Sequence, residues 1–342
     1  MTVRPPTGLH HVTAIAGDPV ENLRFYQGVM GLRLVKRSVN QDDPATYHLF
    51  YADGEGHPGT DLTFFPWPHA KPGTPGIGVV QETYLTVPPG TLEAWEARLV
   101  AAGVRVDPIV LRFGERALPF ADPHGLRLAL VEGPDPFAFT PWHDGPVPAA
   151  EQVRGLHGAR APLREIAPSE RFLTEVMGFE RVGEEHGWLR FVLPGAPAGA
   201  PAGAPAGGAG RILDVREEPD GRRGAWGVGS VHHLAWTVAD GEHQAGLRDA
   251  VARAGRRPSE VIDRFWFRSV YFMEPGGVLF ELATEGPGFA VDEDPAALGE
   301  RLILPPWLEP YRPRIEAVLP DLSCEPPSAA APTAASGPAV AR

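Results

Sequence analysis

The chain has 342 residues, 43% hydrophobic and 22% charged, with 40 glycines and 39 prolines, which indicates a globular protein with many turns and excludes a collagen-like or wholly disordered chain. Its net charge of −12 gives no support for a nucleic-acid partner, and its single cysteine, Cys324, excludes an internal disulfide framework and a cysteine-based zinc site. Neither an apolar leader segment nor an 18-residue apolar run occurs, so we expect a soluble, cytoplasmic protein without a membrane partner.

Two sequence matches with the same spacing reveal an internal duplication. The segment 8–10, Gly-Leu-His, recurs at 155–157, and the segment 25–35 recurs at 172–182 with Val-Met-Gly intact. A finer repeat relates 122–129 to 274–281 and 9–15 to 231–237. The simplest account is four related modules, at about 8–70, 78–135, 153–217 and 230–286.

The first module predicts one strand, one helix and three further strands. The first strand is expected at 9–16, and Asp18 and Pro19 suit the N-cap and first position of a helix that ends at Gly31. Strand-like runs follow at 32–39, 45–52 and 61–66. Each module is therefore expected to be a βαβββ unit in an α+β fold.

The fourth module repeats this order. A strand is expected at 231–238, a helix at 241–254, and strands near 265–273 and 277–284. The turn at 122–125 in the second module is expected to leave His124 exposed to solvent.

The duplication predicts two domains of two modules each, at 8–145 and 153–290. A helical extension is expected at 291–319. Residues 196–210 consist only of Ala, Pro and Gly and are expected to form a flexible insertion, and the tail at 320–342 is expected to be disordered.

Two His-His pairs occupy matching positions at the start of the first and fourth modules. They are His10-His11 and His232-His233. Because side chains alternate along a strand, one histidine of each pair points into the concavity that the modules enclose. The alternative is that these are strand histidines satisfied by ordinary hydrogen bonds.

An acidic residue completes a set of metal ligands. Glu281 lies in an otherwise apolar strand, and its counterpart in the second module is Ala129. A buried carboxylate is costly unless a cation compensates it, and the alternative is a pair with a nearby arginine. Two imidazoles and one carboxylate with open positions suit non-haem Fe(II); Mn(II) fits the same set, whereas a closed structural zinc site requires four protein ligands.

A single metal ion would require modules one and four to share the site. His11 would come from module one, and His233 and Glu281 from module four. Modules two and three would then form a metal-free companion. Their matching positions agree, because Gly158 replaces the second histidine and Ala129 replaces the acid.

Four motifs resemble the vicinal oxygen chelate superfamily, and within it the ring-cleaving dioxygenases that act on hydroquinones. The resemblance covers about 8–312 and implies paired open barrels, with His11, His233 and Glu281 as metal ligands. The motifs are LHHVTAIA from residue 9, YHLFYADGEGHPGTDLTFFPW from 47, RRGAWGVGSVHHLAW from 222 and YFMEPGGVLFELAT from 271.

The same resemblance implies residues around the substrate, namely His10, Thr13, His232, Arg264 and Tyr271. Arg264 could hold a phenolate oxygen and Tyr271 could donate a proton; the alternatives are a surface arginine and a core aromatic residue. On regular strands His10 and His232 would face away from the metal, so their placement requires a bulge or a supporting role behind the ligands. His48 is interpreted as a packed strand histidine.

We therefore hypothesise an Fe(II)-dependent, extradiol-type dioxygenase acting on a hydroquinone or catechol-like aromatic and O2. One alternative is a glyoxalase-type isomerase, which usually has a second glutamate ligand; the corresponding position here falls near Thr63 or Phe64. Another is a non-catalytic protein that binds an aromatic toxin. The oligomeric state, including a homo-oligomer, stays open.

Overall fold

The computed structural model describes residues 4–134, 139–195 and 210–322. The 196–209 part of the expected insertion and the 323–342 part of the expected tail, with Cys324, lie outside the described residues.

Each half of the chain contains two βαβββ modules, as the repeats predict. Module one comprises β1 (Leu9–Ala16), α1 (Pro19–Leu23) continued by the π-helical segment η1 (Arg24–Val29), β2 (Arg33–Asn40), β3 (Asp43–Ala52) and β4 (Asp61–Pro66). Module two comprises β5 (Glu82–Val87), α2 (Leu92–Ala101), β6 (Val110–Arg112), β7 (Glu115–Ala121) and β8 (Arg127–Glu132).

The second half repeats this order. Module three comprises β9 (Gly155–Leu163), α3 (Ile166–Glu175), β10 (Glu180–Glu185), β11 (Trp188–Val192) and β12 (Ile212–Glu217). Module four comprises β13 (Ser230–Val238), α4 (Gly241–Arg253), β14 (Ile262–Asp263), β15 (Arg268–Met273) and β16 (Leu279–Thr284). The C-terminal extension follows as η2 (Phe289–Val291), η3 (Pro295–Ala297), η4 (Glu309–Tyr311) and α5 (Arg312–Glu316).

The start of the first helix shows how local sequence sets an element. The Asp18 carboxylate accepts hydrogen bonds from the backbone amides of Val20 and Glu21, which satisfies donors that a helix start leaves free. Gly31 ends the segment with φ +67°, a conformation that favours glycine. The predicted cap and stop are both confirmed.

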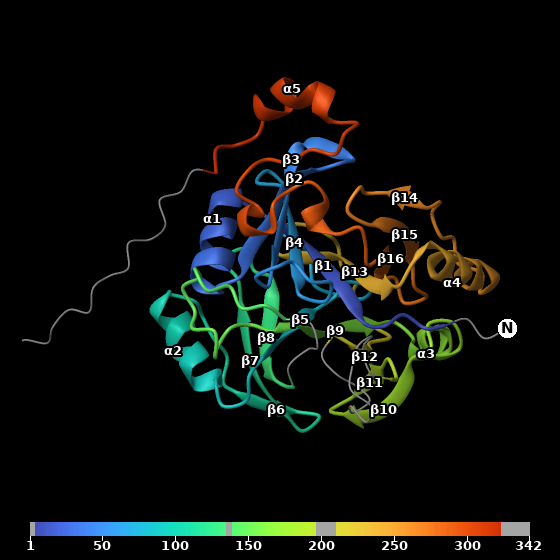
Figure 1. The fold of residues 1–342 in the computed structure, drawn as a ribbon. Helices are drawn as coiled ribbons and strands as arrows, with labels where there is room; N and C mark the ends of the chain where they lie inside the picture. The colour runs from blue at the N-terminus through green and yellow to red at the C-terminus, as the bar shows by residue number, and fades with distance from the viewer. Residues whose placement is uncertain (1–3, 135–138, 196–209, 323–342) are drawn as a thin grey trace, which may run out of the picture.

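The modules pair across the two halves of the chain to form two curled eight-stranded sheets (Figure 1). Modules one and four form the sheet β14-β15-β16-β13-β1-β4-β3-β2, and modules two and three form β10-β11-β12-β9-β5-β8-β7-β6. The antiparallel pairs β1–β13 and β5–β9 join the modules of each sheet. The predicted fold, with modules one and four in one open barrel, is confirmed.

One apolar core runs through both sheets. Along β1, Val12 and Ala14 belong to this core, whereas His11 and Thr13 point to the opposite face. The core thus fixes which face of the strand carries the histidine. Among the described residues, no helix has the length and apolarity needed to cross a membrane.

Two expectations were wrong in detail. The predicted strand at 265–273 begins only at Arg268, because residues 264–267 form a turn in which the Asp263 carboxylate accepts a hydrogen bond from the Phe265 amide at 2.8 Å. His124 lies in the predicted turn, but only 8% of its side chain is exposed, since its Nε2 packs 3.1 Å from a carboxylate oxygen of Glu21.

Candidate metal centre

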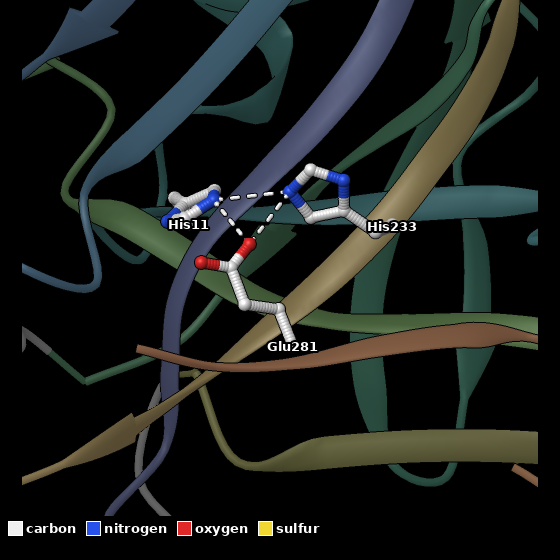
Figure 2. A group of neighbouring side chains, drawn as sticks. All are labelled: His11, His233 and Glu281. Atoms are coloured by element: carbon white, nitrogen blue, oxygen red, sulfur yellow. Dashed lines mark hydrogen bonds and ion pairs between the residues drawn. The ribbon is translucent and has the colours of Figure 1, made fainter. Parts of the chain in front are cut away.

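Three neighbouring strands bring together side chains that are distant in sequence. His11 comes from β1, His233 from β13 and Glu281 from β16, and the three point at one another on the same face of the sheet (Figure 2). The Nε2 atoms of the histidines lie 3.2 Å apart. Oε2 of Glu281 lies 2.9 Å from Nε2 of His233 and 3.3 Å from Nε2 of His11.

The burial of these groups suits a cation. All three residues are at most 3% exposed, and the contacts that Oε2 of Glu281 makes are those with the two imidazoles. Burial would raise the pKa of Glu281, but His11 and His233 together hold it well below its usual value. Burial lowers the pKa of His233. An ionised carboxylate and neutral imidazole therefore direct lone pairs at one point, which a divalent cation would satisfy.

No fourth ligand comes from the equivalent place in module one. Thr63 lies opposite Thr13 in the parallel pair β1–β4, as Glu281 lies opposite Ala235. The Thr63 hydroxyl lies 2.8 Å from the Thr13 hydroxyl and 3.0 Å from Nε2 of His48. Of the two residues expected near this place, Thr63 and Phe64, the register selects Thr63. The set of two histidines and one carboxylate leaves coordination positions open.

The companion sheet lacks this ligand set. Tyr84 on β5 has Gly158 on one side and Ala129 on the other, at the positions that correspond to His11 and Glu281. Neither residue offers a ligand atom.

The first histidine of each pair lies behind the second. Nδ1 of His10 is 3.0 Å from Nδ1 of His11, and Nδ1 of His232 is 2.8 Å from Nδ1 of His233. Register irregularities in the β1–β13 pair rotate the backbone at this point. Burial lowers the pKa of His10 and of His232 to about 3, so both are neutral. Thr13 is fully buried and lies opposite His233 in the β1–β13 pair, and its hydroxyl contacts that of Thr63 rather than lining the cavity.

A small cavity opens on His11 and His233. Arg264 and Tyr271 line it, whereas His10, His232 and Thr13 are not among its wall residues. The Arg264 guanidinium lies 5.7 Å from the centre of the Tyr271 ring. Burial raises the pKa of Tyr271, so its hydroxyl keeps its proton at neutral pH.

Other wall residues were not among the sequence candidates. His48 lines the cavity together with the β2–β3 turn and a set of aromatic side chains. The sequence could have indicated His48, because it lies two residues before Phe50 on β3 and both side chains therefore occupy the same face of the strand. We see no sequence feature that would have placed the β2–β3 turn in the cavity wall. The remaining aromatic walls are Phe65, Trp266 and Phe267.

This fold and this centre define a double-barrel protein of the glyoxalase and dioxygenase type, and sequence comparison agrees. Residues 8–130 match the family model described as Glyoxalase/Bleomycin resistance protein/Dioxygenase superfamily. MhqO of Bacillus subtilis (strain 168), provisionally named a ring-cleaving dioxygenase, is 43% identical over 309 residues, which cover 90% of this chain and 94% of MhqO. The chain belongs to the Glyoxalase/Bleomycin resistance protein/Dioxygenase superfamily.

Two further relatives extend the comparison. The chlorohydroquinone/hydroquinone 1,2-dioxygenase of Sphingobium indicum is 33% identical over 88% of this chain and 92% of that protein. A crystal structure provisionally named a dioxygenase, from Bacillus subtilis, matches with a TM-score of 0.85 at 41% identity, over 93% of this chain and 98% of that one. The chain is accordingly an oxygenase of the ring-cleaving dioxygenase group, and its family implies a metal cofactor.

Proposed function

We propose that this protein is an Fe(II)-dependent ring-cleaving dioxygenase that inserts O2 into a hydroquinone or catechol-like aromatic. The observation that carries the proposal is the buried convergence of His11, His233 and Glu281, two of which, His11 and His233, line a cavity with aromatic walls. The relative that acts on chlorohydroquinone and hydroquinone supports the choice of substrate class. Mn(II) would be held by the same ligand atoms.

In this proposal the three ligands hold the metal, whose chemistry when bound is the transfer of electron density from an electron-rich ring to O2. Arg264 binds and orients a phenol oxygen of the ring by donating charge-assisted hydrogen bonds. Tyr271, which keeps its proton, donates it to an oxygen of the reacting group. Phe50, Trp266 and Phe267 pack against the ring and keep water out of the cavity.

His10, His232 and Thr13 take supporting roles. The two histidines contact the other ring nitrogen of each ligand and hold its orientation. Thr13 positions Thr63 and, through it, His48. The cytoplasmic location and the division at 8–145 and 153–290 stay predictions.

The test is oxygen consumption by protein loaded with Fe(II). We expect O2 uptake with hydroquinone in an oxygen electrode, and loss of both bound metal and uptake in His233→Ala, because two ligands cannot retain the ion in the presence of a competing chelator. His69→Ala is the matched control, since His69 is exposed and lies outside the centre. Absence of uptake across a panel of hydroquinones and catechols would refute the proposal; activity that persists without oxygen would favour the isomerase.

A further inference from the structure

Two turns from different modules meet at the mouth of the cavity. They are residues 40–42, at the end of β2 and before β3, and residues 264–267, between β14 and β15; we call them the mouth turns. The Asp42 carboxylate accepts hydrogen bonds from Nη1 and Nη2 of Arg264 at 3.2 and 2.8 Å. The Gln41 side chain donates to the Arg264 carbonyl oxygen at 2.9 Å.

The two partners differ in their access to water. The Arg264 side chain is 15% exposed and the Asp42 side chain 73% exposed. Among the described residues that line the cavity, Arg264 is the one arginine and Asp42 the one carboxylate. The Asp42 carboxylate is therefore the group that balances the charge of Arg264 in this wall.

The companion sheet has an arginine at the position that corresponds to Arg264, and the carboxylate partner of that arginine is buried. Arg112 precedes Phe113 in the turn after β6, as Arg264 precedes Phe265, and both phenylalanines have positive φ, 49° and 75°. Arg112 makes an ion pair with Glu82, which is 1% exposed. An arginine at this place in the module thus takes a carboxylate partner in both sheets. Only in the metal-site sheet does that partner lie in solvent, where another anion can replace it.

The cavity as it stands is smaller than an aromatic ring requires. Its volume is about 30 Å³, whereas an apolar cavity of about 150 Å³ holds benzene. A ring that binds here would have to displace part of the wall, to which Arg264 and Asp42 both belong.

We propose that Asp42 is a specificity-determining residue that neutralises Arg264 and so makes the cavity select uncharged dihydroxylated rings over rings that carry a carboxylate. The inference rests on the proposed function for its substrate class. With Asp42 present, a ring carboxylate must displace an existing ion pair to reach Arg264. Without Asp42, the mostly buried guanidinium has no carboxylate partner at the mouth and favours an anionic ligand.

The test compares two probes, hydroquinone and 2,5-dihydroxybenzoate, in wild type, Asp42→Asn and Asp43→Asn. Binding is followed by calorimetry and by intrinsic tryptophan fluorescence, to which the cavity residue Trp266 contributes, with metal-free and with Fe(II)-loaded protein. In Asp42→Asn we expect affinity for 2,5-dihydroxybenzoate to rise about tenfold relative to that for hydroquinone. The ratio of kcat/KM values of the two rings should shift in the same direction.

Asp43→Asn is the matched control. Asp43 follows directly in the chain, but its carboxylate accepts hydrogen bonds from Thr46 and Trp67, outside the cavity. We expect its affinity ratio to equal that of wild type. Asp42→Ser serves as a second variant if the amide perturbs the turn. Adding Arg264→Gln to Asp42→Asn should abolish the gain.

An affinity ratio in both Asp42 variants equal to that in Asp43→Asn would overturn the inference, as would a gain that survives Arg264→Gln. Failure of the proposed function is a separate result, because it appears as absence of O2 uptake by wild-type protein with hydroquinone. The binding ratio does not depend on turnover, so the two failures are distinguishable.

Discussion

At the scale of single residues, the orientation of a proposed metal ligand depends on a side chain that is not itself a ligand. Oε1 of Glu281 accepts a hydrogen bond of 2.5 Å from the Ser269 hydroxyl on the neighbouring strand β15. This contact turns the other oxygen, Oε2, towards His11 and His233. Groups that orient a metal ligand in this way contribute measurably to metal affinity.

We therefore expect Ser269→Ala to weaken metal binding about 10- to 100-fold, because Glu281 is then free to rotate. The measurement is Fe(II) or Mn(II) affinity by competition with a chelator. Ser38→Ala is the control: Ser38 is equally buried, but its hydroxyl has no hydrogen-bond partner among the described residues. Equal affinities in the two variants would show that Ser269 does not position the ligand.

At the scale of elements, the C-terminal extension contacts both strand β2 and the cavity wall residue Trp266. Lys36 is fully buried, and its ammonium donates to the carbonyl oxygen of Phe289 and to the carboxylates of Asp292 and Glu293. Asp292 also accepts from Nε1 of Trp266 at 3.0 Å, and Trp266 lines the cavity. A helical extension was expected here, and its ion pairs with β2 were not.

Lys36→Ala should lower the free energy of unfolding by about 3–5 kcal/mol, because it leaves buried carboxylates without their cation. Urea denaturation measures the change. Lys71→Ala is the control, because Lys71 is an exposed loop residue, and it should change the free energy of unfolding by less than about 0.5 kcal/mol. A Lys36 variant as stable as the Lys71 variant would mean that the extension is not held by this contact.

At the scale of the whole molecule, the two sheets share one topology but differ in the charged or polar groups that surround one corresponding interior position. Glu82 lies opposite Arg160 in the β5–β9 pair, as His233 lies opposite Thr13 in the β1–β13 pair. Glu82 is surrounded by guanidinium groups where the other sheet has imidazoles. These groups belong to Arg112, Arg127 and Arg160. In this sheet arginines compensate the buried acid Glu82, whereas in the other sheet a metal cation would compensate the buried acid Glu281.

This arrangement predicts one metal ion per chain, located in the sheet of modules one and four. Elemental analysis of the Fe(II)-loaded protein should give one equivalent, which Glu82→Ala leaves unchanged and His11→Ala removes. Two equivalents in wild type, or loss of metal in Glu82→Ala, would contradict the assignment. Because Glu82→Ala leaves arginines unpaired in the interior, its folding is checked by circular dichroism first.

The sequence by itself determined the four modules, their pairing across the halves and the candidate ligands His11, His233 and Glu281. These predictions follow from the sequence repeats, from the alternation of side chains along a strand and from the cost of burying an acid, all of which can be recognised from the order of residues along the chain. Its expectations for Arg264 and Tyr271 depended on family resemblance, and the cavity lies against both of them.

Only the tertiary structure decided what lies around the ligands. His48, Gln41 and Asp42 line the cavity, and the last two contact the β14–β15 turn, an approach of distant segments that no local pattern encodes. His124 is buried by a helix from another module, and an irregular register places His10 behind its neighbour. Local order sets which face of a strand a side chain occupies, whereas its neighbours on that face depend on long-range packing.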